Sequence, residues 1–302
     1  MFYILVAFFS PIFGALTNTI ESKLSNNIFK HQTTMIFYIS LMNWVFLPLC
    51  LFFGTPSIPS QKAMLCYLGV AMVDIIYLYP FYTAMKVIDN SIVAALFSLG
   101  QITIPLMSFL FLGEILNLEQ YIGFTIIIMS SVALSIKGTR IPKLSKAFYY
   151  MVFASLLRSG YIILEKYTLI EDENWINMVI YPSILSGILP LSFLFVRKWR
   201  KDIIKNFPPY YNKFKIFAIN EFICYLELVT EIYGISGLSP VVSAAISATL
   251  PMFMLGFCYI GLKKFNIPLN EKITRQQLIK KIFCFVLILL GVVLVVPSSS
   301  GL

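Results

Sequence analysis

The amino-acid sequence predicts an all-α polytopic membrane protein with ten transmembrane helices in two inverted five-helix repeats. The first observation is composition: of 302 residues, 59% are hydrophobic and 12% are charged, whereas about a quarter of a soluble domain is charged. The second is that the hydrophobic residues gather into ten segments, each close to the roughly 20 residues that cross a bilayer as a helix. The third is that the second half of the chain repeats features of the first.

The ten segments follow one another with short connections. They cover residues 3–21, 34–53, 63–85, 91–112, 118–137, 147–167, 175–196, 213–235, 239–262 and 279–297. The longest connections are basic and polar, which suits a membrane surface, so we expect no soluble domain. The first segment has neither a basic leader nor a small-residue cleavage site, and we expect it to be a retained helix.

The net charge of +9 is explained by topology. Of the 23 Lys and Arg residues, 20 lie in connections that follow odd-numbered segments. Because Lys and Arg gather on the cytoplasmic side of a membrane, we expect these connections to face the cytoplasm and both termini to face away from it. We therefore expect an integral protein of a bacterial inner (plasma) membrane, surrounded by lipid and without a nucleic-acid partner.

Two stretches of the chain correspond between its halves. Residues 83–103 and 231–251 both run from the end of one span, through a short turn, into a span rich in Ala and Ser. Residues 14–23 correspond in the same way to 157–166. With five helices in each half, the halves have opposite orientations, as in many secondary transporters; the alternative is chance similarity between apolar helices. The predicted repeats are residues 1–140 and 141–302.

Three sequence stretches carry a family resemblance. They are AMKVIDNSIVAAL at 84–96, FLFLGE at 109–114 and YIGFTIIIMSSVAL at 121–134. Together with Gly14, Lys23 and Pro251, they resemble the EamA-type half of the drug/metabolite transporter superfamily. The resemblance implies ten helices in two inverted repeats and a carrier of small organic metabolites. Ten-helix members are mostly drawn with cytoplasmic termini, opposite to the orientation that the basic residues indicate.

Charged side chains inside the spans mark a candidate site, because each costs roughly 2.5–3.5 kcal/mol at the bilayer centre. Asp74, Arg158 and Glu227 lie at the centre of their spans or within one turn of it. Gln101 and Thr249 are at the centre of two further spans. Polar groups from five spans therefore reach the same depth, where inverted-repeat carriers hold their substrate.

Helical spacing groups these residues. Asn220, Cys224, Glu227 and Glu231 follow i, i+4, i+7 and i+11, which is one face of a helix, while Glu221 points away from that face. Glu231 is near the end of its span, where we expect it to reach the membrane interface. In the span 63–85 a comparable face holds Asp74, Tyr77, Leu78 and Phe81, with Tyr82 beside it. The predicted substrate-binding residues are Asp74, Tyr77, Phe81, Tyr82, Gln101, Arg158, Tyr161, Asn220, Glu227 and Thr249.

Arg158 is the one basic residue at depth. A guanidinium group can hold a carboxylate or phosphate through two parallel hydrogen bonds, so one hypothesis is that Arg158 binds an anionic group of the substrate. Asp74 or Glu227 would then take an ammonium group or a coupling proton, since a buried carboxylate binds a proton more readily than an exposed one. The alternative is a permanent ion pair of Arg158 with Asp74 or Glu227.

The leading function is secondary active transport of a small organic metabolite, such as an amino acid, an amine or a nucleotide-like compound, by alternating access. The alternatives are a scaffold or assembly protein without flux and a lipid-modifying membrane enzyme. The sequence has no HExxH, DDxxD or Ser/His/Asp set, and the acidic residues 171–173 are predicted to form a solvated loop. Five Cys lie inside apolar spans and the single His31 lies in a loop. We therefore expect no enzyme activity, cofactor or metal site; the sequence leaves the oligomeric state open, and a monomer is compatible with it.

Overall fold

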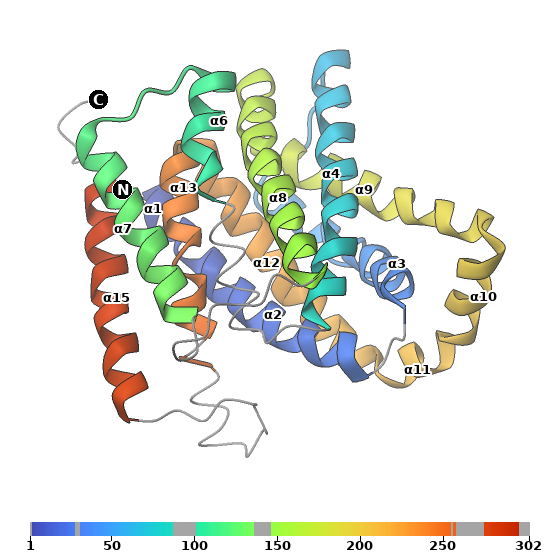
Figure 1. Cartoon of the computed structure of the whole chain (residues 1–302). Coiled ribbons are helices and arrows are strands. Elements are labelled where there is room, and N and C mark those ends of the chain that lie inside the picture. Colours follow the sequence, from blue (N-terminus) through green and yellow to red (C-terminus); the bar gives the residue numbers. More distant parts are fainter. Residues whose placement is uncertain are drawn as a thin grey trace.

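The computed structural model describes residues 2–27, 31–86, 101–135, 146–254, 256–257 and 275–295. Every regular element within these ranges is a helix. Figure 1 shows them as a bundle of long helices crossed by several shorter ones. The α-helices of the first half are α1 (Phe2–Ala7), α2 (Phe9–Asn27), α3 (Gln32–Asn43), α4 (Gln61–Met85), α6 (Thr103–Leu112) and α7 (Leu118–Ser135). Those of the second half are α8 (Lys146–Glu171), α9 (Trp175–Ile188), α10 (Arg197–Lys205), α11 (Phe207–Asn212), α12 (Phe214–Gly237), α13 (Pro240–Ser247) and α15 (Arg275–Val295).

Among the residues that the structure describes, four helical stretches are long and apolar enough to cross a membrane: Phe2–Glu21, Gln32–Phe52, Gln61–Ala84 and Trp175–Phe195. The helices α8, α12 and α15 have 26, 24 and 21 residues, and at about 1.5 Å per residue each is long enough for a hydrocarbon core of roughly 30 Å. They carry more charge than the first four. The chain is thus an all-α membrane protein, and the count of ten spans stays a prediction.

Two predicted spans change their helical type before they end. The segment 34–53 begins as α3 and continues as a 3₁₀ helix, η1 (Leu47–Phe52). The segment 175–196 begins as α9 and continues as a second 3₁₀ helix, η2 (Leu189–Phe195). Both 3₁₀ helices start with Leu-Pro-Leu, and a proline cannot donate the backbone hydrogen bond that would continue an α-helix.

Other boundaries also differ from the sequence prediction. The predicted span 3–21 is divided at Phe8 into α1 and α2, and α2 continues to Asn27. The connection 197–212, which was expected to lie on the membrane surface, contains α10 and α11. Of the predicted spans 91–112 and 239–262, residues 91–100 and 258–262 lie outside the described residues.

Helix starts and ends follow local chemistry. Ser60 accepts a hydrogen bond from the backbone N–H of Ala63 (3.1 Å) at the start of α4. Ser239 accepts one from Val242 N–H (3.3 Å) at the start of α13, where Pro240 occupies the first turn. Such caps satisfy backbone donors that have no partner inside the helix. Gly113 ends α6 with a φ of 69°, a left-handed conformation that glycine adopts without strain.

The acidic residues 171–173 lie at the end of α8 and in the connection after it, where Glu171 and Glu173 are exposed as expected. The Asp172 carboxylate accepts hydrogen bonds from Tyr67 Oη and Asn177 Nδ2, both at 2.8 Å. Glu171 pairs with Lys62 (Nζ to Oε1, 2.5 Å). Because Glu171 and Asp172 have partners on other helices, these contacts join the start of α4 and the start of α9 to the end of α8.

Three helix pairs make the most extensive contacts among the described elements: α7 with α15, α4 with α8, and α2 with α12. In Figure 1 α7 and α15 lie side by side at one end of the bundle. There, a Cβ added to Gly291 would stand 2.7 Å from the carbonyl oxygen of Gly123. Small residues of this kind let two membrane helices approach closely.

Helix α3 contacts both α9 and α12, and α4 also contacts α9. Helices α6 and α13 contact each other as well. Trp44, directly after α3, donates through Nε1 to the carbonyl oxygen of Ser183 on α9 (3.2 Å). Large apolar side chains such as Phe52, Leu110 and Phe111 are exposed on the outside. An apolar exterior around a partly polar interior is what a lipid environment requires.

Candidate functional site

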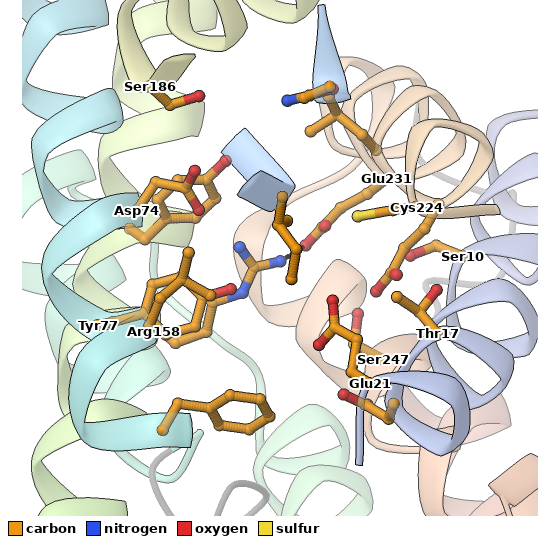
Figure 2. A pocket seen from close by; sticks show the side chains of 18 of the residues that line it. Ser10, Thr17, Glu21, Asp74, Tyr77, Arg158, Ser186, Cys224, Glu231 and Ser247 are labelled. Carbon is orange, nitrogen blue, oxygen red and sulfur yellow. Dashed lines mark hydrogen bonds and ion pairs between the residues drawn. The ribbon is translucent and has the colours of Figure 1, made fainter. Parts of the chain in front are cut away.

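A cavity of about 210 Å³ lies inside the bundle, and eight stretches of the chain contribute to its wall. The helices α2, α4, α8 and α12 supply most of the charged and aromatic groups. Further lining residues come from α3, from α9, from Gln101 and from residues 247–254. Figure 2 shows the labelled side chains converging on this space from opposite sides, with Asp74 and Tyr77 on one side and Glu21 and Glu231 on the other.

Arg158 and Glu231 form an ion pair across the cavity. Arg158 Nη2 donates to Glu231 Oε1, and the two side chains are 16% and 8% exposed. The guanidinium carbon lies 4.4 Å from the centroid of the Tyr161 ring and 5.9 Å from that of Tyr77. Aromatic faces attract a cation at these distances. Arg158 is therefore held by a carboxylate and two rings.

This geometry corrects two expectations about Glu231. Glu231 was expected at the membrane interface, but it is buried and lines the cavity. An ion pair of Arg158 was considered with Asp74 or Glu227, and the partner in the structure is Glu231. The α-helix continues to Gly237, beyond the predicted end at residue 235, so Glu231 lies almost two turns inside it.

The aromatic face predicted on α4 lies where it was expected. Asp74, Tyr77, Leu78, Phe81 and Tyr82 all line the cavity. Tyr77 and Phe81 are in ring contact (centroids 6.3 Å apart), and so are Phe81 and Tyr82 (5.5 Å). Tyr161 of α8 lines the same cavity. Helix α4 thus contributes one carboxylate and three aromatic rings.

On α12, the predicted face is only partly correct. Cys224, Glu227 and Glu231 line the cavity, but Asn220 does not. Asn220 is fully buried and donates through Nδ2 to Glu221 Oε1 (2.8 Å) and to Glu21 Oε1 (3.5 Å). Glu221 was expected to point away from this face, yet it also lines the cavity. The Asn220 amide positions the two carboxylates instead of facing the cavity.

Glu227 is close to a glycine of α2. A Cβ on Gly14 would stand 2.5 Å from Glu227 Oε1 and 3.1 Å from a methyl carbon of Leu250. The missing side chain of Gly14 therefore leaves the space that the Glu227 carboxylate occupies, and it explains the close packing of α2 against α12.

Sequence analysis missed Glu21, which lines the cavity and is buried. It was the last residue of the predicted span, whereas α2 continues to Asn27. A signal was available: Ser10, Gly14, Thr17 and Glu21 have the same i, i+4, i+7, i+11 spacing as the face noted on α12. Ser10, Thr17 and Glu21 all line the cavity.

Glu165 was missed as well. It is fully buried on α8, does not line the cavity, and neither carboxylate oxygen has a hydrogen-bond partner among the described residues. It lies seven residues after Arg158, so helical spacing places both on one face of α8.

Of the two polar residues predicted at the centres of further spans, Gln101 lines the cavity and Thr249 does not. Gln101 lines the cavity and is 5% exposed, and its Oε1 has no hydrogen-bond partner in the described ranges. Thr249 does not line the cavity: its hydroxyl donates to the carbonyl oxygen of Ile246 at 2.6 Å. The neighbouring Ser247 and Leu250 face the cavity in its place.

Within the described ranges, no three His, Cys, Asp or Glu side chains are placed to hold a metal ion. Cys50, Cys66 and Cys224 are free thiols.

Comparison with known proteins agrees with the fold. Residues 1–136 match the model of the EamA-like transporter family. A solved crystal structure of a protein is similar over 97% of this chain and 96% of its own, with a TM-score of 0.66 and 11% sequence identity. No curated protein matches the sequence. Residues 1–136 are thus similar to the EamA-like transporter family, part of the drug/metabolite transporter superfamily, and this match together with the apolar helices indicates an integral membrane protein.

Proposed function

We propose that this chain is a secondary active transporter that moves a small organic metabolite by alternating access. The observation that carries the proposal is the cavity itself, which lies among helices from both halves of the chain and holds five acidic side chains and one Arg. Charged groups inside a membrane protein are costly, and they mark solute and ion pathways. A protein without flux has no evident need for them.

The pattern of helix contacts supports two repeats, residues 1–140 and 141–302. If the predicted spans are numbered in order, α2 and α8 begin the two halves, while α4 and α12 are the third spans. If each helix is replaced by its counterpart in the other half, the contact α4–α8 becomes α12–α2. In the same way, the contact α4–α9 becomes α12–α3, and all four contacts are present. The Leu-Pro-Leu start of η1 and η2 adds a sequence match at equivalent places. Rocking of two such halves would expose the cavity to each side in turn.

Asp74 and Glu227 remain the candidates for a coupling proton. Both line the cavity, and the structure gives neither a Lys or Arg partner within ion-pair distance among the described residues. A carboxylate in such a place can exchange a proton when a solute binds or leaves. We also retain the orientation with basic connections in the cytoplasm of a bacterial cell and both termini outside it.

Transport by purified protein in liposomes tests the function. Efflux of radiolabelled choline, spermidine, glutamate and AMP is measured from separate vesicles. Ser186→Trp places an indole in the cavity, since Ser186 lines it and is buried. Ile184→Trp is the matched control, because Ile184 lies on the same helix, is 38% exposed and does not line the cavity.

We expect wild-type protein and Ile184→Trp to move at least one of these solutes and Ser186→Trp to lose at least nine-tenths of that flux. Equal flux in Ser186→Trp would remove the cavity from the transport path. If folded wild-type protein moves none of the four, the proposal of a small-metabolite carrier is wrong for these classes, and a scaffold role becomes the better account.

A further inference from the structure

We propose that the cavity recognises an organic cation, with an ammonium group bound between the carboxylates of Glu21, Glu221 and Glu227. This inference rests on the proposed transport function and names its substrate class. It departs from the hypothesis that Arg158 binds an anionic substrate group.

The charge of the cavity is the first step. Its lining includes five acidic side chains and one basic side chain, Arg158. Arg158 donates to Glu231 and stands over Tyr161, so its charge is already compensated. Binding a solute anion there would require Arg158 to leave a buried carboxylate without a partner, and breaking a buried pair in this way is strongly unfavourable.

The remaining carboxylates form a group on the other side of the cavity. Glu21 Oε1 and Glu221 Oε1 both accept from the single Asn220 Nδ2 at 3.5 and 2.8 Å. Their separation is therefore at most the sum of these distances, which lets one cation contact both. Glu227 lies on the same helix as Glu221, and both line the cavity. No Lys or Arg forms an ion pair with any of the three among the described residues.

A second observation, independent of the carboxylates, also points to a donor-bearing ligand. Gln101 comes from a different part of the chain, lines the cavity and has an unpartnered Oε1 that is buried. A buried acceptor without a partner is unfavourable, so the Gln101 oxygen favours a ligand that donates hydrogen bonds. An ammonium group is such a ligand.

Aromatic surface completes the chemistry. Tyr77, Phe81 and Tyr82 of α4 line the cavity together with the carboxylates. Ring faces attract ammonium and quaternary ammonium groups, and they also bury the carbon chain of an amine. Carboxylates on one side and rings on the other fit an organic cation better than a hydrated inorganic ion or an anion.

Binding measurements with matched variants test the inference. Affinities for choline and spermidine, and for glutamate and AMP as anions of similar size, are measured by the thermal shift of the purified full-length chain. Glu21→Gln and Glu221→Gln remove one carboxylate each while keeping its shape. Glu165→Gln is the control, because Glu165 is equally buried but does not line the cavity.

We expect choline or spermidine to raise the melting temperature, and the dissociation constant to rise at least tenfold in Glu21→Gln and Glu221→Gln. Glu165→Gln should stay within twofold of wild type. Unliganded melting temperatures show that each variant is folded, and removing a buried negative charge should not lower them.

Other outcomes would overturn the inference. Stabilisation by glutamate or AMP and not by either cation would make the substrate class wrong while the transport function stands. NaCl or MgCl₂ without choline could also raise the melting temperature, measured against a choline-free control of equal ionic strength. In that case the bound cation would be inorganic and not organic. Cation affinities unchanged in both cavity variants would place the binding elsewhere. Flux that is absent for all four solutes in liposomes would instead contradict the proposed function.

Discussion

The α4–α8 pair and the α2–α12 pair face each other across the cavity with similar packing and different chemistry (Figure 2). The first pair contributes Arg158, Asp74 and the aromatic rings, whereas the second contributes Glu21, Glu221, Glu227 and Glu231. Helix packing here depends on small and apolar residues, which leaves the polar groups of each wall free to differ. The fold can thus be nearly symmetric while the site has one aromatic wall and one acidic wall.

The largest expected effect comes from breaking the ion pair of Arg158 and Glu231, which joins the two walls. Arg158→Ala leaves Glu231 buried without its partner, and we expect the free energy of unfolding to fall by about 3–5 kcal/mol. Arg158→Ala combined with Glu231→Gln removes both charges and should recover part of this loss. Unfolding titrations in mixed micelles measure both. If the double variant is no more stable than the single one, the pair does not hold the walls together.

A smaller effect is expected from replacing one glycine in each wall, Gly14 on α2 and Gly160 on α8, by alanine. Gly14→Ala places a methyl group where the Glu227 carboxylate lies, so we expect the carboxylate to shift and cation affinity to fall about tenfold, a change of about 1.4 kcal/mol. Gly160→Ala on α8 meets no atom within 4 Å. It should leave affinity unchanged and raise stability by about 0.5–1 kcal/mol, the usual gain of Ala over Gly in a helix.

Thermal-shift titrations with choline follow the affinity of both glycine variants. Loss of affinity in Gly160→Ala, or none in Gly14→Ala, would show that the acidic wall is not the side that binds the solute.

The sequence predicts which residues share one face of a helix better than it predicts which helices meet. The aromatic face of α4 was predicted correctly because helical spacing alone determines it. The choice between Asp74, Glu227 and Glu231 as partner of Arg158 was not, because it depends on how α8 and α12 approach each other. Thr249 was misplaced for a related reason: a central position along a helix does not specify which way the side chain points.

Helix boundaries account for the remaining errors. Glu21 was left out because the apolar segment ends there, although the α-helix does not. Glu231 was assigned to the interface for the same reason. Hydropathy reports where lipid contact ends, and a polar residue that faces the interior of a bundle shortens the apparent span. The matching Leu-Pro-Leu sequences at 47–49 and 189–191 are a further match between the two proposed repeats, and the sequence prediction did not use it.

The smallest expected effect lies at the outer end of the α4–α8 wall. Lys62 pairs with Glu171, and both side chains are partly in solvent. Exposed pairs of this kind contribute little, so Lys62→Gln should leave the melting temperature nearly unchanged. Any difference should disappear in 1 M salt, where the screening length is about 3 Å. A clear loss of stability that persists in high salt would show that the charges of this wall act together from the cavity to its rim.

The two 3₁₀ segments make their spans longer than the same residues would be in an α-helix. A 3₁₀ helix rises about 2.0 Å per residue and an α-helix about 1.5 Å, so rewinding the seven residues of Leu189–Phe195 as α-helix would shorten that segment by about 3.5 Å. The helices before η1 and η2 supply Ser40, Asn43, Ser183 and Ser186 to the cavity wall. In the proposed inverted arrangement α3 and α9 run antiparallel, so lengthening one segment while the other contracts would move these polar side chains in the same direction along the membrane normal.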